Sequence, residues 1–282
     1  MQKPILLLGG RGKVGRHLSA KLSQRQLPHV IATREPRGDS ERLFDWERPE
    51  TFVPAFEGIG ALYIVAPTNR ADHHVVVPPA LALAKDMGVK RFVLLSAASL
   101  PKGGVMMGAI HQWLADHTPE WAVLRPSWFM QNIFEPRHAT SIAENHAIYS
   151  ATGSAKLGFI DAADIAQCAL SALTDEIAWN TDEILTGPQA LSYSDLADEI
   201  SRQSGKHIEH RALSIEDLTQ QLERTGLNRQ YAEILANMDG VIAQSPDEQI
   251  TDAVYRRTGL QPSTFAAILL REAKLLPKNI SA

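Results

Sequence analysis

The chain of 282 residues lacks most features of secreted and membrane proteins. Its single cysteine, Cys168, excludes an internal disulfide framework, and the surrounding DIAQCALSAL pattern predicts a buried helical residue instead of a reactive thiol. No apolar run approaches the roughly 20 residues of a membrane span, and the N-terminus enters a strand pattern without the layout of a signal peptide. These absences predict a soluble, cytoplasmic protein that does not associate with membranes.

Positive charge is also scarce. Lysine and arginine number 28 against 32 aspartates and glutamates, and they are scattered along the chain. Because nucleic-acid binding needs a clustered basic face, we expect no nucleic-acid partner. The histidines include the pairs His73/His74 and His207/His210, but neither an HExxH motif nor a Cys/His cluster accompanies them. We therefore expect surface or partly buried histidines and no metal.

The segment PILLLGGRGKVG, residues 4–15, is the strongest positive signal. A strand-like run from Pro4 to Leu8 leads directly into a glycine turn, and an amphipathic helix pattern begins at Val14. Glycines in such a turn permit positive φ and let a pyrophosphate approach the backbone, and the helix N-terminus offers N–H groups to the phosphates. The segment predicts a dinucleotide site formed by Gly9, Gly10, Arg11, Gly12, Lys13, Val14 and Gly15.

Strand and helix patterns alternate after the glycine turn, which predicts an α/β protein with a Rossmann-type, doubly wound parallel sheet. Residues 1–150 are expected to form an NAD(P)-binding Rossmann domain whose core also includes parts of 151–190, and residues 191–282 a small, mainly helical substrate lobe. A short strand at 157–160 should lead into a helix capped by acidic residues. We expect the other strands at residues 29–33, 42–45, 61–67, 90–99 and 121–126.

The ends of these strands supply further candidate contacts to the cofactor. At the end of the second strand an acid selects NAD, whereas an arginine accommodates the 2′-phosphate of NADP. Arg34 stands there and favours NADP; Glu35 keeps NAD open, and Arg34 is alternatively a solvated loop residue. Tryptophan at the third strand end suits either the adenine or the core. The remaining candidates are Asp45 and Trp46 at the adenine, Ala66 and Pro67 beside the glycine turn, and Ser96 and Ser99 near the nicotinamide.

Two apolar segments suit a substrate pocket. A glycine- and methionine-rich stretch follows the fifth strand, and an aromatic segment follows the sixth. Methionine offers adaptable apolar surface, and ligand pockets are mostly apolar, although the aromatic residues would equally suit a cap on the core. The candidates are Met106, Met107, Trp128, Phe129 and Met130.

The motifs GGRGKVG, KRFVLLSA, WAVLRPSWFMQNIF, FIDAADIA and ILTGPQALSYSDLADEIS occur in this order along nearly the whole chain. With them the chain resembles the NmrA-like branch of the atypical short-chain dehydrogenase/reductase superfamily. Within that branch it is most similar to bacterial relatives of the ergot-alkaloid reductases, the agroclavine and festuclavine dehydrogenase type, which share the LRPxWFMxN pattern. The resemblance implies NADP more often than NAD, with the glycine turn on the pyrophosphate, Arg34 on the 2′-phosphate and Ser96 near the nicotinamide.

One departure from the superfamily affects the chemistry. Its Tyr-x-x-x-Lys pair should follow the fifth strand, but the chain has no such pair and offers Met107-x-x-x-His111 there. We therefore expect either a reductase whose substrate needs little proton donation, such as an iminium or imine, a quinone or an enone, or a non-catalytic NADP-sensing regulator that binds a protein partner. His111 is a candidate proton donor or substrate ligand, or alternatively a packed helix residue. The apolar segments favour the reductase. The sequence leaves open whether the chain forms a homodimer.

Overall fold

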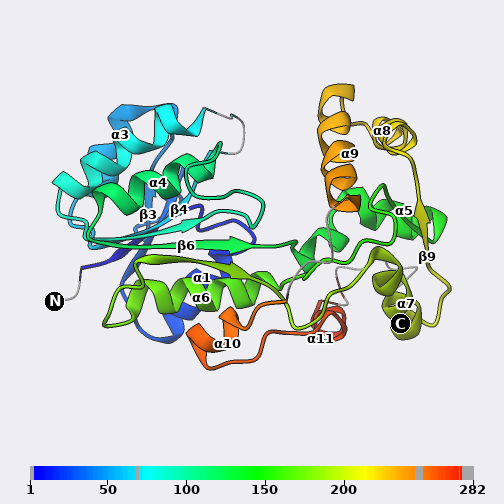
Figure 1. The fold of residues 1–282 in the computed structure, drawn as a ribbon. Helices are drawn as coiled ribbons and strands as arrows, with labels where there is room; N and C mark the ends of the chain where they lie inside the picture. The colour runs from blue at the N-terminus through cyan, green and yellow to red at the C-terminus, as the bar shows by residue number, and fades with distance from the viewer. Residues whose placement is uncertain (1–2, 68–69, 71, 245–249, 273, 275–282) are drawn as a thin grey trace. The chain divides into compact units, whose positions relative to one another are not determined.

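The computed structural model describes residues 3–67, 70, 72–244, 250–272 and 274, which fold as two compact units (Figure 1). The first unit contains residues 1–127, 162–185 and 252–260. The second contains residues 128–161, 186–251 and 261–282.

The first unit is built on a seven-stranded parallel sheet with the order β3-β2-β1-β4-β5-β6-β8. This order confirms the Rossmann-type fold, because the chain leaves β1 in one direction and returns to its other side at β4. The strand bounds are β1 (Ile5–Leu8), β2 (His29–Thr33), β3 (Glu41–Leu43), β4 (Ala61–Val65), β5 (Arg91–Leu95), β6 (Glu120–Pro126) and β8 (Thr181–Leu185).

Helices cover both faces of this sheet, with α3 and α4 on one face and α1 and α6 on the other (Figure 1). The central strands are continuous apolar runs because both of their faces are buried. For example, Leu6 and Leu62 of the sheet share one core with Leu81 of α3 and Leu114 of α4. The helices of the first unit are α1 (Gly15–Gln24), α2 (Phe52–Phe56), α3 (His73–Asp86), α4 (Met107–His117), α6 (Ala162–Thr174) and α10 (Ala253–Thr258), with η1 (Pro49–Thr51).

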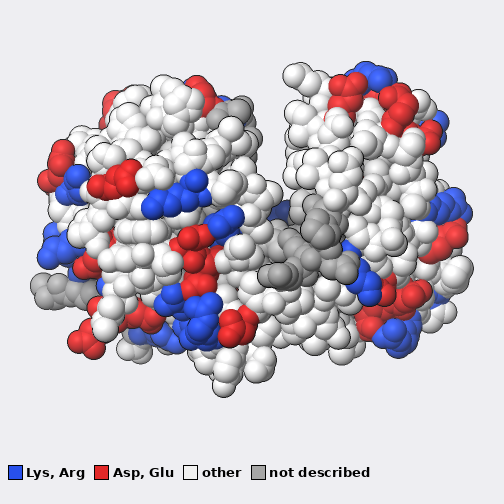
Figure 2. Space-filling model, in the orientation of Figure 1, with Lys and Arg blue, Asp and Glu red and all other residues white. Residues whose placement is uncertain are grey.

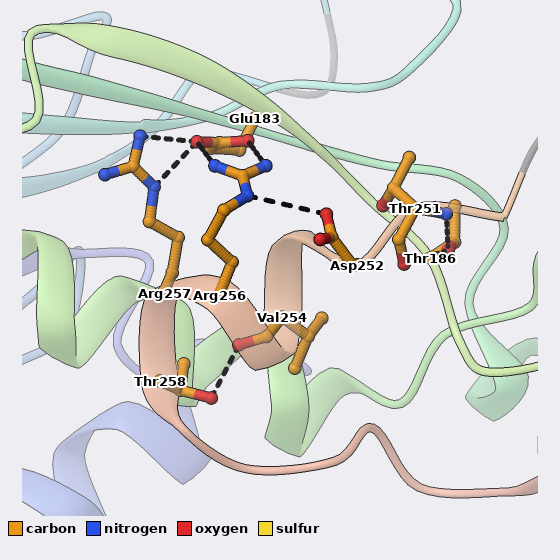
Figure 3. A network of polar contacts seen from close by, with 8 residues as sticks. All are labelled: Glu183, Thr186, Thr251, Asp252, Val254, Arg256, Arg257 and Thr258. Carbon is orange, nitrogen blue, oxygen red and sulfur yellow. Dashed lines mark hydrogen bonds and ion pairs between the residues drawn. The ribbon is translucent and has the colours of Figure 1, made fainter.

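An ion-pair cluster fixes α10 to the edge strand of the sheet (Figure 3). Glu183 of β8 accepts hydrogen bonds from Arg256 at 2.9 and 3.0 Å and from Nε of Arg257 at 2.6 Å. The guanidinium of Arg257 also lies 4.5 Å from the ring centre of Trp179. Because Glu183 is largely buried, these two arginines neutralise a charge that would otherwise be costly inside the unit.

The second unit combines a parallel pair of strands, β7 and β9, with five helices among its described residues. Its largest core includes Ile142, Phe159, Tyr193 and Ile268. The elements are η2 (Met130–Phe134), α5 (Pro136–Asn145), β7 (Ala147–Ser150), α7 (Tyr193–Ser204), β9 (Glu209–Ala212), α8 (Ile215–Arg224), α9 (Arg229–Ala243) and α11 (Phe265–Arg271).

Three segments differ from the expected arrangement. Residues 252–260, which were expected in the helical lobe, lie in the first unit and include α10. Residues 128–150, which the sequence pattern placed with the Rossmann domain, lie in the second unit, where the N–H of Met130 donates to the carbonyl of Ile160 at 2.9 Å. The strand expected at 157–160 is reduced to isolated bridges, Phe129 to Ile160 and Leu157 to Leu191. Each bridge uses one backbone pairing, so the apolar run there serves core packing instead of a sheet.

The charged surface is mixed. On the face that Figure 2 shows, basic and acidic side chains of the first unit lie next to one another instead of forming a patch of one sign. Within the described residues, no group of three or more His, Cys, Asp or Glu side chains could hold a metal ion. None of the described helices has the length and apolar content needed to cross a membrane.

Candidate functional site

A cavity of about 940 Å³ opens at the carboxyl ends of β1, β2, β3 and β4. In open parallel sheets, ligands bind at this edge, near the point where the strand order reverses. Eight of the residues predicted from the sequence line the cavity: Gly9, Arg11, Gly12, Arg34, Asp45, Trp46, Ala66 and Pro67. The other lining residues are Leu8, Ala32, Thr33, Glu35, Phe44, Glu47 and Val65.

The backbone of the glycine turn is closely packed. Gly9 has φ +96°, and a Cβ there would lie 2.8 Å from Cγ2 of Val65, so only glycine fits. A Cβ on Gly15 would overlap the carbonyl oxygen of Gly9. No side chain of the described residues caps α1, and no acid lies in its first turn. The helix N-terminus can therefore offer backbone N–H groups to phosphate oxygens, and these residues fit a dinucleotide.

Arginine side chains lie at the end of β2, where the ribose of a dinucleotide would be. Arg34 lines the cavity, is exposed, and has no ion-pair partner among the described residues. Arg11 from the glycine turn also lines it, but its Nη2 atom donates to both carboxylate oxygens of Glu41, at 2.7 Å each. Two guanidinium groups therefore border the same cavity. That of Arg11 is paired with a carboxylate, and that of Arg34 has no ion-pair partner among the described residues.

Glu41 is a site residue that sequence reasoning missed. Its Oε2 also accepts the backbone N–H of Arg37 at 2.6 Å. The Arg11 hydrogen bond and the Arg37 N–H lower the pKa of the Glu41 carboxyl below its ordinary value. Glu41 begins β3 and pairs in register with Ile31 in the middle of β2, and its contact with Arg11 brings it beside the cavity that Arg11 lines. The only sequence signal is its position at the start of a short strand that follows Gly38.

The residues after β3 form one wall of the cavity. Trp46 packs edge-on against Phe44 with ring centres 4.9 Å apart, so part of the indole belongs to the core and part borders the cavity. Asp45 holds the local turn, because its Oδ1 accepts the N–H of Glu47 at 3.0 Å. Arg70 then bridges to Glu47 at 2.9 Å. Trp46 thus packs partly against the core and partly lines the cavity, and its contact with an adenine stays a prediction.

Pro67, which follows β4, is held by a histidine that we expected nearer the surface. His73 is 1% exposed, and its Nε2 donates to the carbonyl oxygen of Pro67 at 2.8 Å. Its Nδ1 has no partner among the described residues. The neighbouring His74 is exposed, so the two members of the pair have different environments. His73 fixes the wall of the cavity formed by Ala66 and Pro67.

The predicted catalytic residues lie after β5 and on α4. Ser96 follows β5, is buried, and its Oγ has no hydrogen-bond partner within the described chain, whereas Ser99 is exposed. His111 of α4 is fully buried, and its Nε2 lies 3.8 Å from Oδ1 of Asp182. Burial is the main cause that lowers the pKa of His111, while the Asp182 charge acts in the opposite direction. The environment is that of a packed histidine; a role in proton transfer stays a prediction.

The apolar candidates divide between the two units. Met106 and Met107 stand at the start of α4 in the first unit, and Met106 has φ +52°, a strained value for a residue other than glycine. Trp128, Phe129 and Met130 belong to the second unit. There Met130 is 2% exposed in the core, whereas Trp128 is partly buried, and its indole N–H donates to the Tyr193 hydroxyl. A substrate pocket formed by these residues stays a prediction.

Comparison with known proteins agrees with this geometry. Residues 9–176 match the NAD(P)H-binding profile, and residues 118–261 match the NmrA-like family. The uncharacterized oxidoreductase YesF of Bacillus subtilis (strain 168) is 40% identical over 272 residues, which span 94% of this chain and 95% of that protein. Agroclavine dehydrogenase of Claviceps fusiformis is 35% identical over 278 residues, 93% of this chain and 94% of the enzyme.

A solved structure shares the fold. The NADPH-dependent quinone oxidoreductase QOR2 of Escherichia coli, in complex with NADPH, superposes with a TM-score of 0.81 at 24% sequence identity. The similarity covers 95% of this chain and 99% of that chain. This chain therefore shares the fold of that protein.

Proposed function

Because this chain is an oxidoreductase of the NmrA-like, NAD(P)H-binding family, we propose that it transfers a hydride from NADPH to a small apolar or cyclic substrate. The substrate classes are an iminium or imine, a quinone and an enone. The observation that carries the proposal is the cavity at the sheet edge. Among the described residues, the glycine turn before the uncapped helix α1 lines this cavity together with Arg34, which has no ion-pair partner.

The chain's own residues divide the work of holding the cofactor. The glycine turn and the N-terminus of α1 would bind the pyrophosphate, and Arg34 the 2′-phosphate. Trp46 and Asp45 would border the adenine, and Pro67, held by His73, lines the same cavity. When bound, NADPH supplies the hydride, so the protein has only to bind, orient and shield the reacting partners.

The absence of a Tyr-x-x-x-Lys pair selects among substrates. Hydride transfer to an iminium carbon yields a neutral amine without a proton, so positioning suffices. A quinone or an enone takes up a proton as well, and that proton must come from solvent or from another side chain. The proposed donors or substrate ligands are His111, Ser96 and Ser99. Of these, Ser96 has a buried hydroxyl with no partner among the described residues, as expected for a group that a ligand would satisfy.

The experiment that tests the proposal has two stages. NADPH and NADH are first titrated into the purified protein by fluorescence. Oxidation of the bound cofactor is then followed with a panel of cyclic imines, quinones and enones. We expect tight NADPH binding and turnover of at least one of these classes. Tight binding without oxidation across the panel would contradict the reductase and favour the NADP-sensing regulator.

The proton requirement has its own test. A substrate that needs a proton should show a turnover rate that falls as pH rises through the pKa of the donor, whereas an iminium substrate should not. His111→Ala should lower turnover of a quinone or enone modestly. Unchanged kinetics in this variant would return His111 to a packing role.

A further inference from the structure

The ion pair between Arg11 and Glu41 stands beside the cavity, which Arg11 lines. Nη2 of Arg11 donates to Oε1 and Oε2 of Glu41 at 2.7 Å, and Nε donates to Oε1 at 3.2 Å. The Arg11 side chain is 41% exposed and that of Glu41 only 13%, so the carboxylate is the more enclosed member. Charge-assisted bonds of this kind are among the stronger hydrogen bonds in proteins. The guanidinium that borders the cavity is thus already engaged.

The other charges near this ion pair are weakly coupled. Arg37 and Glu35 lie 3.9 Å apart with side chains 76% and 80% exposed, a geometry that contributes little. Arg34 has no carboxylate partner among the described residues. Of the two guanidinium groups that line the cavity, a 2′-phosphate with a charge near −2 would therefore meet one that is uncompensated, that of Arg34, and one whose charge Glu41 cancels.

We propose that Glu41 is a specificity-determining residue: by occupying Arg11 beside the cavity, it limits the preference for NADPH and keeps NADH acceptable. The inference rests on the proposed use of NADPH. A phosphate that recruits Arg11 must compete with the Glu41 carboxylate and also lies in its negative field. NADH carries a hydroxyl in place of that phosphate, so the same carboxylate affects its binding little.

The test compares dissociation constants of NADPH and NADH, measured by fluorescence at one fixed ionic strength, for the wild type and Glu41→Gln. The amide keeps the shape of the side chain and removes its charge. We expect NADPH to bind roughly 5–10-fold more tightly to the variant, while the NADH constant changes by less than about twofold. The matched control is Glu50→Gln, which removes a carboxylate that pairs with Arg48 at 2.9 Å outside the cavity. It should leave both constants unchanged.

A double-mutant cycle keeps the inference testable if one variant folds poorly. Arg11→Met alone leaves the Glu41 carboxylate unpaired and should weaken NADPH binding. Adding Glu41→Gln to it should restore affinity toward the wild-type value, which is the coupling that a competing ion pair requires. The ability of 2′,5′-ADP and of 5′-AMP to displace the cofactor is compared in the wild type, the two single variants and the double variant. The difference between the two nucleotides gives the contribution of the 2′-phosphate to affinity without a turnover assay.

The outcomes separate this inference from the proposed function. Unchanged or weaker NADPH binding in Glu41→Gln, or an equal change for both cofactors, would overturn the role of Glu41 while leaving the reductase intact. A wild type that binds neither cofactor would overturn both. A wild type that binds NADPH and shows the selective gain in Glu41→Gln supports the inference whether or not the substrate panel reveals turnover.

Discussion

The carbonyl of Pro67 accepts a hydrogen bond from Nε2 of His73 at 2.8 Å, which ties the loop after β4 to the first turn of α3. The carbonyl belongs to a residue that lines the cofactor cavity, whereas the histidine ring lies in the interior of the first unit. The position of the cavity wall therefore depends on a side chain that does not itself line the cavity.

We expect His73→Ala to weaken NADPH and NADH binding severalfold and equally, because the loop after β4 loses its anchor. Loss of this buried hydrogen bond should also destabilise the protein by about 1–3 kcal/mol. Both quantities follow from cofactor titration and urea unfolding of the same preparation. His74→Ala, which alters an exposed neighbour, is the control. Unaltered cofactor affinity in His73→Ala would show that the loop is held by other contacts.

Arg34→Ala should discriminate between the two cofactors. Removal of the guanidinium should weaken NADPH by about tenfold or more and leave NADH nearly unaffected, since only NADPH has a phosphate at the ribose. The measurement is the ratio of the two dissociation constants. Arg37→Ala is a suitable control, because Arg37 is exposed and does not line the cavity. Equal losses for both cofactors in Arg34→Ala would contradict the assignment to the 2′-phosphate.

Local patterns predicted the parts of the site that are contiguous in the chain. The glycine turn, β1 and β2 follow from apolar runs and glycine spacing, and the strand ends that border the cavity follow from them. The pair of Arg11 and Glu41 spans 30 residues and depends on the register of β3 beside β2, which no local pattern encodes. The depth of His73 likewise depends on how α3 packs on the sheet.

The sequence pattern also could not predict to which of the two units a segment belongs. The aromatic run after β6 has the composition of a continuing Rossmann core, but Trp128 and Met130 contribute to the core of the second unit. Burial of an apolar side chain can be predicted from its pattern, whereas the identity of its neighbours is a property of the tertiary fold. The substrate-pocket residues are therefore the least determined part of the sequence prediction.

Gly12→Ala tests whether the backbone of the turn is a phosphate site. A Cβ at this position would lie 3.2 Å from the carbonyl oxygen of Gly9 and would occupy the approach to the backbone from the cavity that Gly12 lines. We expect both cofactors to bind about tenfold more weakly or worse, with little change in unfolding midpoint. Gly38→Ala, where an added Cβ meets no atom within 4 Å, should bind them normally. Retained affinity in Gly12→Ala would place the pyrophosphate elsewhere.

His138 of α5 should make the stability of the protein depend on pH. Burial lowers the pKa of His138 well below its ordinary value of 6.5, and the positive charges of Arg137 and His210 act in the same direction. In the unfolded chain the imidazole takes up a proton below about pH 6.5, whereas in the folded protein it stays neutral, so the unfolded state binds more protons there. The contribution to stability is present above about pH 6.5 and is lost as pH falls toward the folded pKa.

The urea concentration at the unfolding midpoint should therefore decrease as the pH is lowered from about 7 to about 5. His138 should contribute up to about 1.4 kcal/mol per pH unit to the change in the free energy of unfolding. In His138→Gln the slope of the free energy of unfolding against pH should be smaller by the contribution of one titrating group. This holds whatever the absolute stability of the variant. His111 and His210 add to the slope in the wild type, because burial lowers their pKa values too. His207→Gln, which replaces an exposed imidazole, is the control. Equal slopes in the wild type and His138→Gln would mean that this imidazole reaches solvent and is protonated in the folded protein.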